Sequence, residues 1–225
     1  MKDLLVACET IKDEVLKVVE KNHFLDDIIW MDGMLHNNPD LLRSELQKAI
    51  HENTSYDHIL FAYGNCGNAL VGLYSEGSDL IIPATADCIS MLLHDSEEIQ
   101  TIRKNTYFFT KGWIEGEKSL IVEYEHCMKK YGEKRTKTIF ESLLKHYKNL
   151  MFIDCEAYPS EKYISTTKDF AKKAGLEMVL QRGNLTLLEK LITKLWDHDF
   201  ILISKGEQVE FQHFGNQTQS NLNIL

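Results

Sequence analysis

The chain has 225 residues, of which 44% are hydrophobic and 26% charged, and its formal net charge is −9. This length and composition are typical of one globular domain with a full apolar core. The negative charge argues against a nucleic-acid partner, and the basic stretch 129–138, flanked by glutamates, is interpreted as a solvated connection between helices. No run of about 18 apolar residues is present, so no membrane span is expected.

The N-terminal segment becomes acidic within a few residues and lacks the apolar core of a signal peptide. We therefore expect a cytoplasmic protein. In that compartment the five cysteines stay reduced, and clustered cysteines are more often metal ligands or catalytic groups than disulfides.

Short apolar runs rich in Val, Ile and Phe alternate with longer amphipathic stretches. Strands are expected at 4–8, 27–31, 58–63, 79–83, 106–110, 149–154, 176–180 and 199–204. Helices are expected at 9–21, 39–52, 88–93, 96–104, 117–131, 135–147, 160–174 and 184–196. Near-continuous apolar strands that alternate with helices indicate βαβ units. The predicted fold is a Rossmann-like α/β fold, with a mostly parallel sheet and helices on both faces.

The sequence shows no linker rich in proline, glycine or serine, so residues 1–215 are predicted to form a single α/β domain. The paired helices at 117–147 interrupt the alternation and could form a small helical insertion or lid. The polar segment 216–225 is expected to be a flexible tail. Asn38 is expected to cap the helix that begins at Pro39.

Cysteines recur where predicted strands end, at Cys8, Cys66, Cys88 and Cys155. The carboxyl ends of parallel strands share one edge of a sheet, so residues distant in sequence can meet there. Thiolates gathered in this way suit zinc or an iron–sulfur cluster. Cys155 could complete the ligand set or be the inert end of a core strand, and His36 competes with it for the fourth position. Cys127, within a predicted helix, is assigned no role.

The loop after strand 58–63, which contains Cys66, has the most features expected of a ligand-binding loop. Its glycines permit a sharp turn and close approach of the backbone to a ligand. If a helix begins just after Cys66, its dipole would favour the thiolate. Trp113, after another strand end, could wall a pocket for a planar ligand or be a loop aromatic. The residues predicted to contact a small-molecule ligand are Tyr63, Gly64, Asn65, Gly67, Asn68 and Trp113.

Several common catalytic motifs are absent. The sequence contains no Gly-x-Ser-x-Gly elbow, no His-Glu-x-x-His helix, no dinucleotide-binding Gly-x-Gly-x-x-Gly and no Cys-x-x-Cys pair. Hydrolase, dinucleotide-dependent and thioredoxin-type functions are therefore disfavoured.

An ordered set of segments resembles the prokaryotic family called domain of unknown function 1638, over roughly residues 1–200. These segments are Ala7-Cys8-Glu9, Leu35-His36 to Pro39, Tyr63-Gly64-Asn65-Cys66-Gly67-Asn68, Ile82-Pro83 with Asp87-Cys88-Ile89, and Thr110-Lys111-Gly112-Trp113. The chain departs from the family pattern at three places. At Ala84-Thr85-Ala86, members commonly have a basic residue and a histidine. Many members have glycine in place of His94 and proline in place of Lys111.

The resemblance implies an association with corrinoid-dependent methyltransferases and corrinoid proteins in one-carbon metabolism, and it carries over to Cys8, Cys66, Cys88 and His36. One hypothesis is a metalloprotein that acts in or alongside corrinoid-dependent methyl transfer. The alternative is a non-enzymatic accessory module that binds a corrinoid protein or an iron–sulfur cofactor. A third option is an enzyme with Cys66 as nucleophile and His36 as its partner. The oligomeric state is left open.

Overall fold

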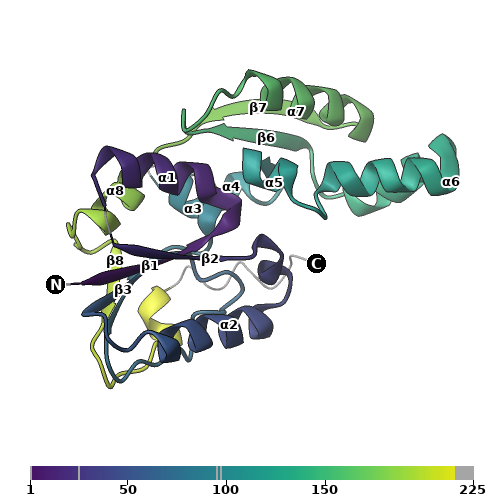
Figure 1. Ribbon diagram of the computed structural model, residues 1–225. Helices are drawn as coiled ribbons and strands as arrows, with labels where there is room; N and C mark the ends of the chain where they lie inside the picture. Colours follow the sequence, from purple (N-terminus) through teal and green to yellow (C-terminus); the bar gives the residue numbers. More distant parts are fainter. Residues whose placement is uncertain (1, 25, 95, 97, 216–225) are drawn as a thin grey trace. The chain divides into compact units, whose positions relative to one another are not determined.

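The chain folds into two compact units in the computed structural model, which describes residues 2–24, 26–94, 96 and 98–215 (Figure 1). The first unit comprises residues 1–94 and 184–225, and the second comprises residues 95–183. This division differs from the single domain predicted for 1–215, because the strands form two separate sheets and not one. The predicted tail, 216–225, lies outside the described residues.

The sheet of the first unit has five strands in the order β2-β1-β3-β4-β8. The strands are β1 (Asp3–Cys8), β2 (Asp27–Met31), β3 (His58–Ala62), β4 (Asp79–Pro83) and β8 (Phe200–Ile203). The first four run parallel, and β8 pairs with β4 in the antiparallel sense. The mixed, mostly parallel sheet confirms the Rossmann-like α/β prediction.

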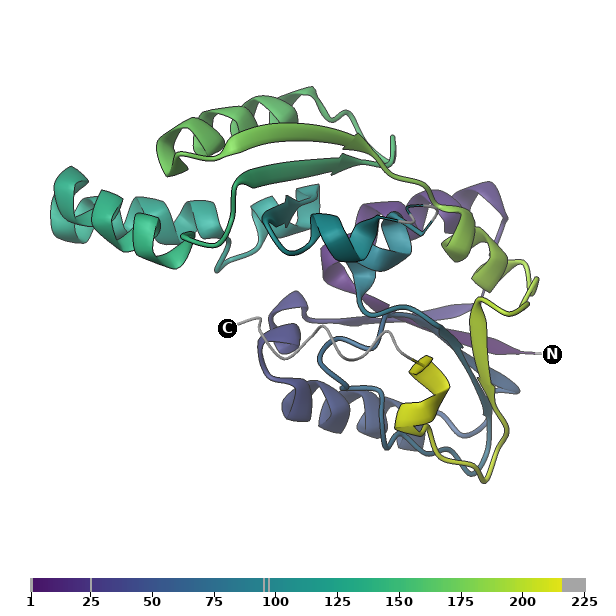
Figure 2. The same cartoon turned by 180° about the vertical axis from the view of Figure 1, so that it is seen from behind.

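Helices cover both faces of this sheet. They are η1 (Glu9–Ile11), α1 (Lys12–Lys21), η2 (Gly33–Asn37), α2 (Pro39–Glu52), α3 (Cys88–Leu92) and α8 (Thr186–Ile192). Helices α1 and α8 contact each other on one face, and α2 lies on the other (Figure 1; seen from behind in Figure 2). From β1 the chain passes to β2 and then returns across β1 to β3. The strand order therefore reverses between β1 and β3, where open α/β sheets form their ligand crevice.

The elements form where the sequence pattern indicates. All six residues of β1 are buried, as expected for a strand covered on both faces. Helix α2 begins at Pro39, and the Asn38 side chain accepts a hydrogen bond from the Leu41 amide at 3.1 Å. The predicted cap is therefore confirmed, and it fixes where the chain turns from β2 into α2.

The second unit has a parallel sheet in the order β5-β6-β7, made of β5 (Thr106–Phe109), β6 (Asn149–Asp154) and β7 (Glu177–Arg182). Its helices are α4 (Ile99–Ile102), α5 (Lys111–Glu115), α6 (Leu120–Leu143) and α7 (Glu161–Ala174). Its apolar core joins Phe109 and Phe152 of the sheet to Phe140 of α6 and Phe170 of α7.

The predicted helical segment 117–147 contains α6, which breaks at Gly132 and lies on the connection between β5 and β6. At Gly132 the backbone has a φ of 73°, a conformation that interrupts a helix and suits glycine. Within the described ranges, no helix combines the length and apolar character needed to cross a membrane.

Candidate metal centre

Three cysteines follow three adjacent strands of the first unit. Cys8 is the last residue of β1, Cys66 lies in the loop after β3, and Cys88 begins α3 after β4. Strands β1, β3 and β4 are parallel neighbours, so the segments that leave their carboxyl ends share one edge. The cysteines thus stand beside the reversal of strand order between β1 and β3.

The loop after β3 packs directly against the loop after β4. The amide of Asn65 donates to the Thr85 carbonyl at 2.9 Å, and the amide of Cys66 donates to the Ala86 carbonyl at 2.8 Å. A Cβ atom at Gly64 would lie 2.4 Å from the Asp87 Cα. Only glycine permits this backbone contact, which brings the Cys66 and Cys88 segments together.

Cys66 occupies an unusual backbone conformation. Its φ is 40°, and the next two residues, Gly67 and Asn68, also have positive φ values of 68° and 69°. The helix considered just after Cys66 is absent, because a left-handed run cannot start a right-handed helix; residues 66–72 form turns instead. A non-glycine residue with positive φ is uncommon, and such strain concentrates at functional sites.

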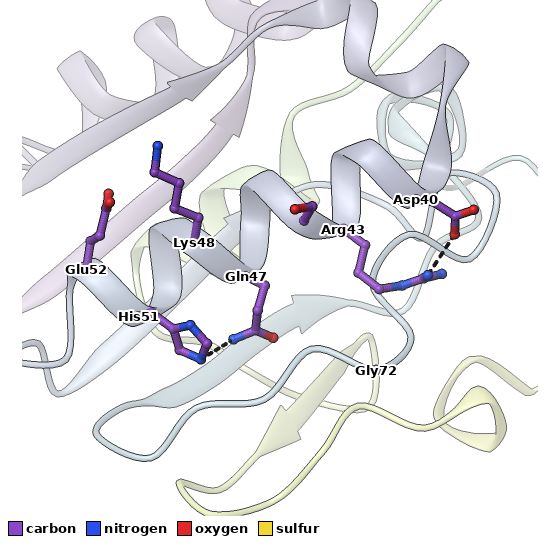
Figure 3. A pocket seen from close by; sticks show the side chains of 8 residues that line it. Asp40, Arg43, Gln47, Lys48, His51, Glu52 and Gly72 are labelled. Carbon is purple, nitrogen blue, oxygen red and sulfur yellow. Dashed lines mark hydrogen bonds and ion pairs between the residues drawn. The ribbon is translucent and has the colours of Figure 1, made fainter.

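Side chains from the loop and from α2 hold this turn. The Asn65 amide donates to the Asn68 side-chain oxygen at 2.8 Å, and Arg43 donates to the Asn68 carbonyl at 2.8 Å. Arg43 also binds Asp40 at 2.9 Å in a polar groove of about 560 Å³ along α2, which contains none of the thiols (Figure 3). Both oxygens of Asn68 therefore hold the loop, and contact of Asn68 with a ligand stays a prediction.

Two hydroxyl groups lie at the thiols. The Cys8 sulfur is 3.0 Å from the Thr10 hydroxyl, which is in turn 3.9 Å from the Cys88 sulfur. Tyr63, buried at the end of β3, is close enough to Cys8 that each group shifts the pKa of the other. Cys8 and Cys88 are buried, and Cys66 is partly exposed. Thr10 was not predicted, because a threonine after a strand carries no distinguishing signal.

Burial raises the pKa of the Cys8 thiol and the pKa of the Cys66 thiol. Negative charge adds to the effect, since Cys88, Asp87 and Cys8 raise the pKa of Cys66 and Glu9 raises the pKa of Cys8. In the metal-free protein both groups are therefore neutral thiols at pH 7. This direction is opposite to the thiolate that a helix dipole would favour. Asp87 caps α3 as predicted, accepting from the Ser90 amide at 2.8 Å.

His36 lies in η2, between β2 and α2. Its Nδ1 is hydrogen-bonded to the Gly33 carbonyl, and burial lowers its pKa, so the ring is neutral. Such a bond fixes the proton on Nδ1, a tautomer also found in histidines that bind metals through Nε2. The turn also lies against the thiol region, because a Cβ atom at Gly33 would be 2.7 Å from a methyl carbon of Thr10.

Cys155 and Trp113 belong to the second unit. Cys155 follows β6 and Trp113 lies in α5, whereas Cys8, Cys66 and Cys88 follow strands of the five-stranded sheet. Because the strands form two sheets, Cys155 does not share the edge of the five-stranded sheet, and its role as a ligand stays a prediction. Cys127 lies in α6, also in the second unit.

The three sulfur atoms are spread apart. In the described chain, the group of three ligand atoms that all lie within 4.8 Å of one another comes from Asp197, His198 and Asp199, and the cysteines do not form such a group. Lys190 neutralises that acidic turn, at 2.8 Å from Asp197 and 2.6 Å from Asp199, and its hydrogen bond lowers the pKa of Asp197 to about 2. The acidic cluster is therefore explained by ion pairing.

Substituting Gly64 by alanine tests the contact between the two loops. The added methyl group would collide with the backbone of Asp87, which cannot rotate away. We expect Gly64→Ala to destabilise the protein by about 2 kcal/mol or more in denaturant unfolding. Gly116→Ala is the control, because its Cβ would lie no closer than 3.4 Å to the Gly112 carbonyl oxygen. Equal stability of the two variants would contradict the close packing.

The buried thiols also predict a pH dependence. Their folded-state pKa values exceed the ordinary thiol value of 9.0, so the unfolded chain loses these protons first as pH rises. Above about pH 9 the unfolding free energy of the metal-free protein should fall, by up to about 1.4 kcal/mol per pH unit for each thiol. Urea titrations from about pH 8 to pH 10 should show a shallower fall in Cys66→Ala than in wild type or Cys127→Ala. Identical slopes would refute the assignment for Cys66.

The family comparison covers most of the chain. The model of the family described as protein of unknown function (DUF1638) matches residues 30–192, which include His36, Cys66 and Cys88, while Cys8 precedes this range. Searches of curated proteins and of solved structures found no match. On the extent of the family match, the chain belongs to the DUF1638 family.

Proposed function

We propose that this protein is a cysteine-ligated metalloprotein, with Cys8, Cys66 and Cys88 as the metal ligands. The observation that carries the proposal is the arrangement of three thiols on the segments that follow three adjacent parallel strands. Glu9 and Asp87 are the charged side chains that raise the thiol pKa values, and both are acidic. An acidic, thiol-rich and largely buried site suits a soft cation.

His36 is the best candidate for a fourth ligand. Its ring is neutral, its Nδ1 is bonded to the Gly33 carbonyl, and its turn lies against Thr10 beside the thiols. Cys155 loses the support of a shared sheet edge, because it follows a strand of the second sheet. A histidine among cysteine ligands is known for both zinc and iron–sulfur sites.

The spacing of the sulfur atoms favours an iron–sulfur cluster over a single zinc ion. Zinc–sulfur bonds of about 2.3 Å at tetrahedral angles hold sulfur atoms about 3.8 Å apart. The three cysteine sulfurs do not all lie within 4.8 Å of one another. A cluster binds its cysteines through different iron atoms and therefore accepts a wider set. When bound, such a group supplies electron transfer or an electrophilic metal position.

The thiol environment does not favour a cysteine nucleophile. A nucleophilic cysteine needs a lowered pKa from a neighbouring cation or a helix N-terminus. Here burial and acidic neighbours raise the pKa of Cys66. The same raised pKa values are compatible with metal binding, because a metal displaces the protons of its thiol ligands.

We further propose that the metal centre acts in or alongside corrinoid-dependent methyl transfer, a step that depends on the family resemblance. In the catalytic version, a methyl group would pass from Co(III) to a thiol sulfur. The cobalt–carbon bond breaks with its electron pair left on cobalt as Co(I), a sulfur–carbon bond forms and the thiol proton goes to solvent. In the accessory version, the protein holds its cofactor for a corrinoid protein. The deep burial of Cys8 and Cys88 suits this second version.

Anaerobic purification followed by metal and sulfide analysis tests the proposal. Wild type is expected to carry iron with acid-labile sulfide, and Cys8→Ser, Cys66→Ser and Cys88→Ser should each lose most of it because each removes a thiolate ligand. Cys127→Ser is the matched control and should keep the full metal content, since Cys127 lies in the second unit. Metal-free wild type, or equal metal in Cys66→Ser, would contradict the proposal.

Loss of the methyl group from methylcobalamin then separates the catalytic from the accessory version. Loaded wild-type protein, mixed with methylcobalamin and a small thiol, should convert it faster than Cys66→Ser if the protein is the catalyst. The cobalt absorption spectrum follows the reaction directly. Equal rates in wild type, Cys66→Ser and buffer would reject the catalytic version and favour the accessory one.

A further inference from the structure

Buried polar atoms without a hydrogen-bond partner in the structure lie on the two loops that lead to Cys66 and Cys88. Among the described residues of the first unit they include the Tyr63 hydroxyl, the Asn65 side-chain oxygen and the Thr85 hydroxyl. These side chains are 2%, 0% and 4% exposed. Native proteins contain few such atoms, because each gives up its hydrogen bonds to water on folding. Their concentration on the two loops that carry Cys66 and Cys88 points to a polar group that is bound there.

Tyr63 is the member of this group whose hydroxyl lies beside a proposed metal ligand. It directly follows β3, in which Ala62 pairs with Ala7, the residue before Cys8. Its hydroxyl lies close enough to interact with Cys8 and also within electrostatic range of Cys66 and Cys88. A phenol is a hydrogen-bond donor at ordinary pH. A neutral thiol is a weak acceptor, whereas a sulfur that carries negative charge is a strong one.

We propose that Tyr63 is a positioning residue for the metal centre, and that its hydroxyl donates a hydrogen bond to the Cys8 sulfur when that sulfur is a metal ligand. The inference rests on the proposed metal site. In the metal-free protein the buried hydroxyl has the neutral Cys8 thiol as its neighbour, which is only a weak acceptor, and loading of the site turns that sulfur into a strong one. Thr10, at 3.0 Å from the same sulfur, supplies a second hydroxyl.

If Tyr63 has this role, Tyr63→Phe should weaken metal binding without lowering the melting temperature of the metal-free protein. Tyr63→Phe removes a buried hydroxyl that meets only a weak acceptor, the neutral Cys8 thiol, in the metal-free protein, and it keeps the buried ring. The melting temperature of the metal-free variant should therefore equal or exceed that of wild type. The same change removes a donor to the bound thiolate. We therefore expect metal affinity to fall by about 10- to 100-fold, as for other residues that orient metal ligands. A residue needed only for packing would not separate the two effects.

The experiment uses the full-length, metal-free protein and Cd²⁺ as the probe. Calorimetry gives the melting temperature, and competition with a chromophoric chelator gives the Cd²⁺ dissociation constant, with the sulfur-to-cadmium charge-transfer band as the signature of thiolate ligation. Tyr107→Phe is the control, because Tyr107 is a largely enclosed tyrosine of the second unit, packed edge-on against Phe109 and Tyr147. It should leave Cd²⁺ affinity unchanged.

The possible outcomes are distinguishable. A Tyr63→Phe protein with unchanged or higher metal-free melting temperature and weakened Cd²⁺ binding supports the assignment. Unchanged Cd²⁺ binding, or a lower metal-free melting temperature, overturns the role of Tyr63 while leaving the metal site intact. Equal weakening in Tyr107→Phe also overturns it. Wild-type protein that shows no thiolate band with Cd²⁺ and takes up no iron or sulfide overturns the metal site, and with it this inference. If wild type takes up iron and sulfide but no Cd²⁺, equal iron retention in Tyr63→Phe and wild type overturns the role of Tyr63.

Discussion

The contact between the backbones of Gly64 and Asp87 is the constraint on which the candidate site depends. Because residue 64 has no side chain, the loop after β3 can run against the loop after β4, joined by the amides of Asn65 and Cys66. The contact sets Cys66 next to the segment that begins α3 at Cys88. The parallel register of β1 and β3 then places Cys8 at the same edge. Three cysteines distant in sequence are thus positioned by one close approach and two strand pairings.

The local elements of the fold follow closely from the sequence. The predicted ranges 27–31, 39–52, 79–83 and 149–154 coincide with β2, α2, β4 and β6. These segments have strong local signals, namely continuous apolar runs, a capping asparagine and a proline in the first turn. Sheet membership has no such signal. Which strands pair is decided by contacts between distant residues, so the sequence does not predict that β5, β6 and β7 form a second sheet. Cys155 follows a strand of that sheet.

At the site, too, the sequence predicts the features that depend on local residues and not those that depend on contacts between distant segments. Strand ends mark Cys8, Cys66 and Cys88, and the N-cap role of Asp87 is readable from its position before α3. The turn after Cys66 is not readable, because its positive φ values depend on packing against the loop after β4 and on the bond from Arg43. Nor do Thr10 and Thr85 carry a pattern. Thr10 matters because its buried hydroxyl lies near the sulfurs of Cys8 and Cys88, and Thr85 because its buried hydroxyl has no hydrogen-bond partner among the described residues.

Among the described residues, the metal-free site lacks a positive charge that would balance ionised thiols. Its thiols are neutral because burial and acidic neighbours oppose their ionisation, and nearby polar atoms lack partners. A bound metal would replace the protons and supply the missing positive charge. X-ray absorption spectroscopy at the edge of the metal in anaerobically purified protein tests this claim most directly. The account predicts a first shell dominated by sulfur at about 2.3 Å that is lost in Cys66→Ser and retained in Cys127→Ser. A first shell of oxygen and nitrogen alone, or one unchanged in Cys66→Ser, would contradict it.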